Sequence, residues 1–343
     1  MLSAVETRVE DVTDLSNYNV PNADCALLKC VLVFLGLENR QSGQSFQWMV
    51  NNFCKSDVDV GLELVATSLL PQGSGLGTSS ILAGCVLASV AKCTGLEAEK
   101  LTRYCDNGSH DLMEAVLKVE QLLTTGGGYQ DQMNGLVGGA KMVTCATAQF
   151  PIHLQTERLH MEHSFQECFN ESLTLVFTGK TRLAKNILRN VLRRWALRTP
   201  TIKKTVAGLV KGAQDSRQAI LNSDLDRVGR SLSEYWEYKK SMAGEESGAE
   251  PLIVREVLAA LHRRGVVRGG SLCGAGGGGF MVLLKAAGVT TDHLRKVLAE
   301  ELPEESEVSN FTWHDCKISD AGLSTRVLSS DAPGHFDITW HSV

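Results

Sequence analysis

The chain lacks an excess of positive charge, a long hydrophobic run and an obvious targeting segment. Its 34 Lys and Arg residues are outnumbered by 39 Asp and Glu residues, giving a net charge of −5. This balance argues against nucleic acid or an anionic membrane as the main partner. The longest apolar run, residues 81–91, is too short to span a bilayer. Residues 1–14 are acidic without an apolar core, so we expect no signal or transit peptide.

Paired cysteines and internal repeats are also missing. None of the 10 cysteines forms a C-x-x-C pair, and Cys30 and Cys85 lie inside apolar runs. This usage predicts a reduced, cytoplasmic protein without structural zinc. A chain of 343 residues with 43% hydrophobic residues is long enough for about two domains. A polar, mixed segment around residues 154–172 places the predicted boundary, giving domains 1–160 and 161–343.

Hydrophobic periodicity predicts helices and strands in both halves of the chain. Apolar residues alternate from Val60 to Leu70, which is typical of a strand. Strands are predicted at 60–70, 136–146, 172–178, 266–272, 280–284, 309–318 and 322–328. Helices are predicted at 23–37, 78–93, 111–123, 182–197, 203–222, 224–240, 251–263 and 290–302.

A glycine-rich turn between the predicted strand 60–70 and the helix 78–93 is the first candidate site. Glycines let the backbone approach a ligand, and free N–H groups of the first helical turn point at an anion. The expected phosphate contacts are Pro71, Gly73, Ser74, Gly75, Leu76, Gly77, Thr78, Ser79 and Ser80. The alternative is an ordinary strand–turn–helix connection in which the hydroxyls only cap the helix.

Two acidic residues form the second candidate site. Glu120 lies on or beside the apolar face of the helix 111–123, where a carboxylate is seldom buried unless it is paired or metal-bound. Asp131 follows eleven residues later, after three consecutive glycines and between Gln130 and Gln132. The alternatives are a rim glutamate that reaches water and a polar turn that caps the next element.

A second glycine loop lies between two apolar, strand-like runs. It consists of Gly274, Ala275, Gly276, Gly277, Gly278 and Gly279. Flexible linkers usually join polar segments, so this setting favours a backbone pressed against another loop or a phosphate. A phosphate loop, a carboxylate for a cation and a positioned aspartate are the parts that phosphoryl transfer needs.

The three motifs resemble those of the kinase superfamily named for galactose, homoserine, mevalonate and phosphomevalonate. Its second motif, P-x-x-x-G-L-G-S-S-A, matches residues 71–80, with Thr78 in place of the first serine. Its magnesium glutamate precedes its active-site aspartate by eleven residues, as Glu120 precedes Asp131, and G-A-G-x-G-G matches residues 274–279. The resemblance implies a two-domain α+β fold: a ribosomal protein S5 domain 2-like N-terminal part and a ferredoxin-like C-terminal part.

Within this superfamily, residues 124–132 and 177–186 look like those of L-fucose kinases. The similarity runs from about residue 60 to residue 328 and covers the C-terminal kinase portion of the animal enzymes. The family's first motif is not found in residues 1–19, so we expect an N-terminally truncated kinase domain. A heptose or other sugar kinase, or a catalytically inactive binding or regulatory protein, remains an alternative.

The resemblance implies ATP and Mg²⁺ as cofactors and L-fucose as substrate. The product would be L-fucose 1-phosphate, in the GDP-L-fucose salvage pathway. Asp131 would orient the sugar hydroxyl, while Ser79, Thr78 and Glu120 would hold Mg²⁺. The expected substrate contacts are Gly127, Gly128, Tyr129, Gln130, Lys180 and Arg182. No nucleic acid or membrane partner is expected, and we interpret the basic run Arg189, Arg193, Arg194 and Arg198 as a solvated helix face.

Overall fold

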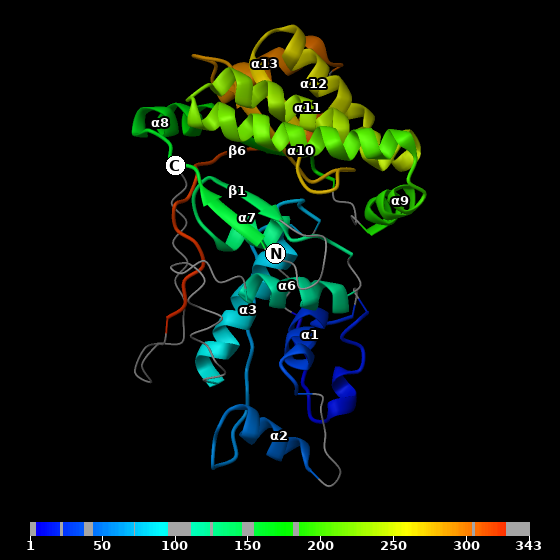
Figure 1. The fold of residues 1–343 in the computed structure, drawn as a ribbon, viewed down its shortest axis with the longest axis vertical. Helices are drawn as coiled ribbons and strands as arrows, with labels where there is room; N and C mark the ends of the chain where they lie inside the picture. Colours follow the sequence, from blue (N-terminus) through cyan, green and yellow to red (C-terminus); the bar gives the residue numbers. More distant parts are fainter. Residues whose placement is uncertain are drawn as a thin grey trace. The chain divides into compact units, whose positions relative to one another are not determined.

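The computed structural model describes residues 5–20, 23–37, 44–71, 73–94, 111–123, 126–145, 154–180, 185–303 and 306–326. The chain divides into two compact units (Figure 1). The first comprises Met1–Ser68, Ser79–Gly138 and Ala321–Val343, and the second comprises Leu69–Thr78 and Gly139–Asp320. The predicted domain boundary at residue 160 stays a prediction.

The described elements of the first unit are helical. They are η1 (Val12–Leu15), α1 (Ala26–Phe34), α2 (Phe46–Phe53), α3 (Thr78–Thr94), α6 (Asp111–Leu122) and α7 (Gln130–Leu136). The predicted helices 23–37, 78–93 and 111–123 are confirmed as α1, α3 and α6. A Cβ atom on Gly84 of α3 would lie 2.3 Å from Leu136 Cδ1 of α7, so the glycine lets these helices approach closely.

The predicted strand from Val60 to Leu70 is wrong. The alternation is present, because Leu62, Leu64 and Ala66 are half-buried while Val65 is 82% exposed. The described residues nevertheless form only two sheets, and neither includes this segment. An extended chain becomes a strand only through a hydrogen-bonded neighbour, which a local sequence pattern does not report.

The second unit contains both sheets. A hairpin pairs β1 (Lys141–Cys145) with β2 (Leu154–Arg158). The larger sheet is antiparallel, with the order β4-β5-β3-β6. Its strands are β3 (Leu173–Phe177), β4 (Val267–Leu272), β5 (Phe280–Lys285) and β6 (Thr312–Asp315). The predicted strands 172–178, 266–272 and 280–284 are therefore confirmed, and β6 and β1 lie inside two longer predicted segments.

The strand predicted at 322–328 is wrong over its described part, residues 322–326. Leu323 N–H donates to the carbonyl of Leu136 at 2.8 Å, and a Cβ atom on Gly322 would lie 2.6 Å from the same oxygen. The segment is thus held against the end of α7 by a close backbone contact and does not form a ladder.

Helices cover both faces of the larger sheet. They are α8 (His163–Ser172), α9 (Lys185–Ala196), α10 (Pro200–Leu221), α11 (Leu225–Ala243), α12 (Leu252–Arg263) and α13 (Thr291–Glu301), with the short η2 (Glu245–Ser247) and η3 (Glu307–Asn310). Met281 and Leu283 of β5 belong to one buried cluster with α12 and α13. Leu284, which points to the opposite face, belongs to another cluster with α8 and the α10–α11 connection.

Helix periodicity predicted α9 to α13 correctly. In Figure 1, α10 and α11 lie side by side as long helices, and the turn between them ends in Asp224, whose side chain accepts from Arg227 N–H at 2.9 Å. This N-cap starts α11. Within the described residues, no helix is long and apolar enough to cross a membrane.

Candidate active site

The turn before α3 bends through three glycines with left-handed backbone. Gly73, Gly75 and Gly77 have φ values of +75°, +78° and +68°, which other residues rarely adopt. Between them, buried Ser74 shares a hydrogen bond of 3.0 Å with Thr78 Oγ1 and accepts from Leu76 N–H at 3.3 Å. The hydroxyls therefore brace the loop, whose remaining member Gln72 lies outside the described residues.

The second glycine loop packs directly against this turn, as the sequence predicts. A Cβ atom on Gly274 would lie 2.7 Å from Gly75 Cα, and one on Gly279 would lie 2.4 Å from Ser74 O. Phe280 N–H donates to Ser74 O at 2.9 Å, next to that contact. Two backbones meet with no room for side chains, so glycine is required at these positions for a steric reason. Ala275, Gly276, Gly277 and Gly278 complete this loop.

The predicted substrate residue Lys180 supports the second loop through its backbone. Its carbonyl accepts from Gly279 N–H at 2.7 Å. Its ammonium group forms an ion pair with Glu307 at 2.5 Å, and both side chains are exposed. The structure thus assigns Lys180 a protein partner, while its contact with substrate stays a prediction. Arg182 lies outside the described residues.

Glu120 is a buried carboxylate at the end of α6. Its side chain is 6% exposed, and Oε1 accepts a hydrogen bond of 2.7 Å from Ser80 Oγ in the first turn of α3. Burial raises the pKa of Glu120, the Ser80 hydrogen bond opposes this, and the negative charge of Asp131 adds to the rise. A buried carboxylate with a raised pKa gains most from a bound cation.

The donor set at Glu120 fits Mg²⁺, which prefers few carboxylates and keeps several waters. Within the described ranges, no three His, Cys, Asp or Glu side chains gather to hold a metal, so a cation here would rely on Glu120 and hydroxyls. Ser79 is exposed and Ser80 is buried against Glu120. The roles of Ser79 and Thr78 as ligands stay predictions.

Asp131 lies in the first turn of α7 and is exposed. Its charge acts on Glu120, so the two predicted carboxylates belong to one neighbourhood of the first unit. A Cβ atom on Gly127 would lie 3.7 Å from Glu120 Oε2, and one on Gly128 would lie 2.6 Å from Gln130 Oε1. Tyr129 directly precedes α7. Residues 127–130 therefore connect the surroundings of buried Glu120 to exposed Asp131.

Gln132 has an unsatisfied buried amide. Its side chain is fully buried, and Nε2 donates to the carbonyl of Gly128 at 3.3 Å. Its Oε1 has no hydrogen-bond partner among the described residues. The sequence placed this amide beside Asp131, but only the structure shows that it points inward and ties α7 to the glycine segment.

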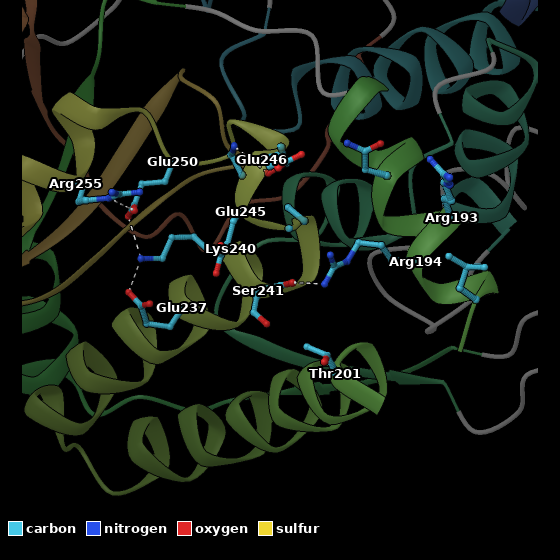
Figure 2. A pocket seen from close by; sticks show the side chains of 16 residues that line it. Arg193, Arg194, Thr201, Glu237, Lys240, Ser241, Glu245, Glu246, Glu250 and Arg255 are labelled. Atoms are coloured by element: carbon cyan, nitrogen blue, oxygen red, sulfur yellow. Dashed lines mark hydrogen bonds and ion pairs between the residues drawn. The ribbon is translucent and has the colours of Figure 1, made fainter. Parts of the chain in front are cut away.

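A cavity of about 1120 Å³ in the second unit was not expected from the sequence. Figure 2 shows Arg194 of α9 reaching into it, with a hydrogen bond to the carbonyl of Ser241. Arg194 Nε is buried and has no hydrogen-bond partner in the part of the chain that the structure describes. Arg193 also lines the cavity. The interpretation of the basic run as a solvated face is therefore wrong for Arg194, because its guanidinium lies against Ser241 of α11 and Gly244.

Comparison with known proteins identifies the family. The description "GHMP kinases N terminal domain" matches residues 44–139, and "GHMP kinases C terminal" matches residues 216–302. The chain belongs to the GHMP kinase family. The first match contains the turn before α3 and both carboxylates, and the second match contains the second glycine loop. Residues 177–186, with Lys180 and Arg182, lie between the two matches.

Two curated relatives match almost the whole chain. The chain is 29% identical over 313 residues to the bifunctional fucokinase/GDP-fucose pyrophosphorylase of Arabidopsis thaliana, covering 91% of this chain and 26% of that protein. It is 28% identical to the L-fucokinase/L-fucose-1-P guanylyltransferase of Bacteroides fragilis, covering 86% and 29%. The chain therefore spans less than a third of the length of either relative.

A solved structure supports the fold. The galactokinase of Lactococcus lactis, crystallised with galactose, matches 87% of this chain and 75% of its own with a TM-score of 0.56 and 15% identity. The α+β two-domain GHMP kinase fold that the sequence predicts is therefore confirmed.

Proposed function

We propose that this chain is an ATP-dependent sugar kinase that phosphorylates L-fucose at its anomeric hydroxyl. The observation that carries the proposal is the pair of interlocked glycine loops, Gly73–Gly77 and Gly274–Gly279, where Gly75 and Gly274 meet backbone to backbone. Backbone N–H groups held in such a loop before a helix are suited to bind phosphates. The two curated relatives with fucokinase in their names support the choice of sugar.

In this proposal, one set of residues binds the triphosphate and another binds Mg²⁺. The loop N–H groups and the first turn of α3 hold the triphosphate, while Glu120 and the hydroxyls of Thr78 and Ser79 hold Mg²⁺. Bound Mg²⁺ would neutralise negative charge on the phosphates. Asp131 orients the sugar hydroxyl and accepts its proton as the new O–P bond forms and ADP leaves.

The remaining predicted residues would contact the sugar or the transferred phosphoryl group. Gly127, Gly128, Tyr129 and Gln130 precede or flank Asp131 and would contact the hydroxyl groups, and Lys180 and Arg182 would approach the transferred phosphoryl group. Amide and hydroxyl side chains suit a polyhydroxylated ligand because they both donate and accept hydrogen bonds. A cytoplasmic location and a place in fucose salvage belong to the same proposal.

The decisive experiment measures ADP release from the purified chain with L-fucose, galactose, mannose or a heptose phosphate. We expect turnover with L-fucose, and Asp131→Asn should lower it about 1000-fold while fluorescent ATP-analogue binding persists. Glu114→Gln is the matched control, because Glu114 is an exposed carboxylate on α6 that pairs with Lys118.

The other outcomes would change the proposed substrate, the proposed activity or the role of Asp131. Turnover with the heptose phosphate alone would reassign the substrate. ATP binding without turnover on any sugar would favour the regulatory alternative, and full activity of Asp131→Asn would refute the role of this aspartate.

A further inference from the structure

Lys239 of α11 is a buried lysine that is not among the predicted site residues. Its side chain is 8% exposed, and its ammonium group donates to the carbonyl oxygen of Gly274 in the second glycine loop. Lysine is almost never buried unless its charge is compensated. A charged donor also makes a stronger hydrogen bond than a neutral one, so this contact is a strong link between α11 and the loop.

Aromatic rings of the same helix surround this charge. The Lys239 ammonium lies 5.2 Å from the ring centre of Tyr235 and 5.8 Å from that of Trp236, within the range of cation–π attraction. Trp236 is itself buried and would lie 3.3 Å from a Cβ atom on Gly276. The end of α11 therefore contacts the second loop at both Gly274 and Gly276.

The contact continues from the second loop to the first. Gly274 meets Gly75 so closely that a Cβ atom on either residue would clash with the other loop. A shift of Gly274 towards Gly75 would therefore displace the turn that precedes α3. Both loops and α11 belong to the second unit, so this chain of contacts lies within one compact body.

We propose that Lys239 is a positioning residue for the phosphate-binding turn, acting through Gly274. This inference rests on the proposed function, because it assigns the turn to ATP. Holding the loop in its binding conformation before ATP arrives lowers the entropic cost of binding. Lys239 touches neither substrate nor reacting atoms in this role.

The neighbouring Lys240 provides a matched control. Its ammonium pairs with Glu237 at 2.6 Å and with Glu250 at 3.0 Å. Figure 2 shows Glu250 between Lys240 and Arg255 on the wall of the cavity. Both ammonium groups lie near the Trp236 ring, at 5.8 Å and 5.9 Å from its centre. Only Lys239 binds the loop carbonyl, whereas Lys240 binds carboxylates.

The first test measures amide hydrogen exchange in peptides covering residues 73–77 and 273–279. We expect Lys239→Met to speed exchange in both loops about 10-fold, and Lys240→Met to leave it near the unsubstituted rate. Should Lys239→Met fail to fold, Lys239→Gln, which keeps a neutral donor, takes its place and should give a smaller increase. Unchanged exchange in a folded Lys239 variant would overturn the proposal.

The second test measures the affinity for a fluorescent ATP analogue and the KM for L-fucose. Lys239→Met should weaken ATP binding about 10-fold without changing the KM for the sugar. Ethylammonium should restore affinity to Lys239→Ala, whereas ethanol, a neutral molecule of similar size, should not. Absence of this rescue would contradict the role of the ammonium group.

The two proposals fail in different ways. Faster exchange in a chain that binds no ATP, even unsubstituted, would refute the proposed function while sustaining the effect of Lys239 on the loops. Normal ATP binding in Lys239→Met with unchanged exchange would refute the positioning role and leave the proposed function standing.

Discussion

The interlocked glycine loops and the Glu120–Asp131 neighbourhood are built on different physical grounds. The loops meet backbone to backbone, with Gly279 against Ser74 O and Gly274 against Gly75. The carboxylates depend on side-chain chemistry, with Glu120 buried against Ser80 Oγ and Asp131 exposed. The first region is therefore specified by the absence of side chains and the second by the cost of burying a charge.

We expect the largest effect on stability from adding a side chain where the two glycine loops meet. Gly279→Ala should destabilise the chain by about 3 kcal/mol, because it adds a backbone clash to a left-handed φ of +86°, and it should abolish ATP-analogue binding. Gly288→Ala is the matched control, since Gly288 has a φ of +72° and open space around it, and should cost about 1 kcal/mol. Urea unfolding measures both, and equal losses would show that φ alone matters.

Removing the carboxylate of Glu120 should have opposite effects on activity and stability. Glu120→Gln should lower turnover about 100-fold or more by removing a metal ligand. The pKa of Glu120 is raised in the folded state, so the folded chain holds this proton at pH values where the unfolded chain has lost it. The associated stability is complete below the ordinary glutamate pKa and decreases as pH rises through the folded-state pKa.

Glu120→Gln should therefore raise the melting temperature at pH 7.5 in the presence of EDTA and change it less at pH 4. Glu114→Gln, at an exposed position of the same helix, should produce neither effect. A lower melting temperature for Glu120→Gln at pH 7.5 would show that ionised Glu120 stabilises the fold and would contradict the desolvation argument.

The smallest expected change in stability concerns the exposed pair Lys180–Glu307. Lys180→Met and Glu307→Gln both remove this pair, and each should change the free energy of unfolding by less than about 0.5 kcal/mol. Only Lys180→Met should lower turnover, by about 10-fold, if the ammonium approaches the phosphoryl group as proposed. Equal loss of turnover in both variants would identify the pair, and not the ammonium, as the contributor.

Local patterns predicted most of the helices but missed α2, α7 and α8, and they predicted the strands unevenly. The apolar periodicity of α9 to α12 is a property of each segment, and its prediction was correct for that reason. Residues 60–70 show strand-like alternation without a ladder in the described structure, while β2 formed in a segment that looked merely polar. Strand formation depends on a hydrogen-bonded partner strand, and the periodicity of one segment carries no information about that partner.

The sequence by itself determined the family, because the two glycine loops and the eleven-residue spacing of Glu120 and Asp131 are linear features. It also favoured a close approach of the second loop to another loop or to a phosphate, since five of its six residues are glycines. Only the tertiary structure decided which loop that is, that Ser80 partners Glu120, and that Lys239 rather than Lys240 reaches Gly274. These depend on how helices and loops pack across long sequence separations, where no local propensity acts.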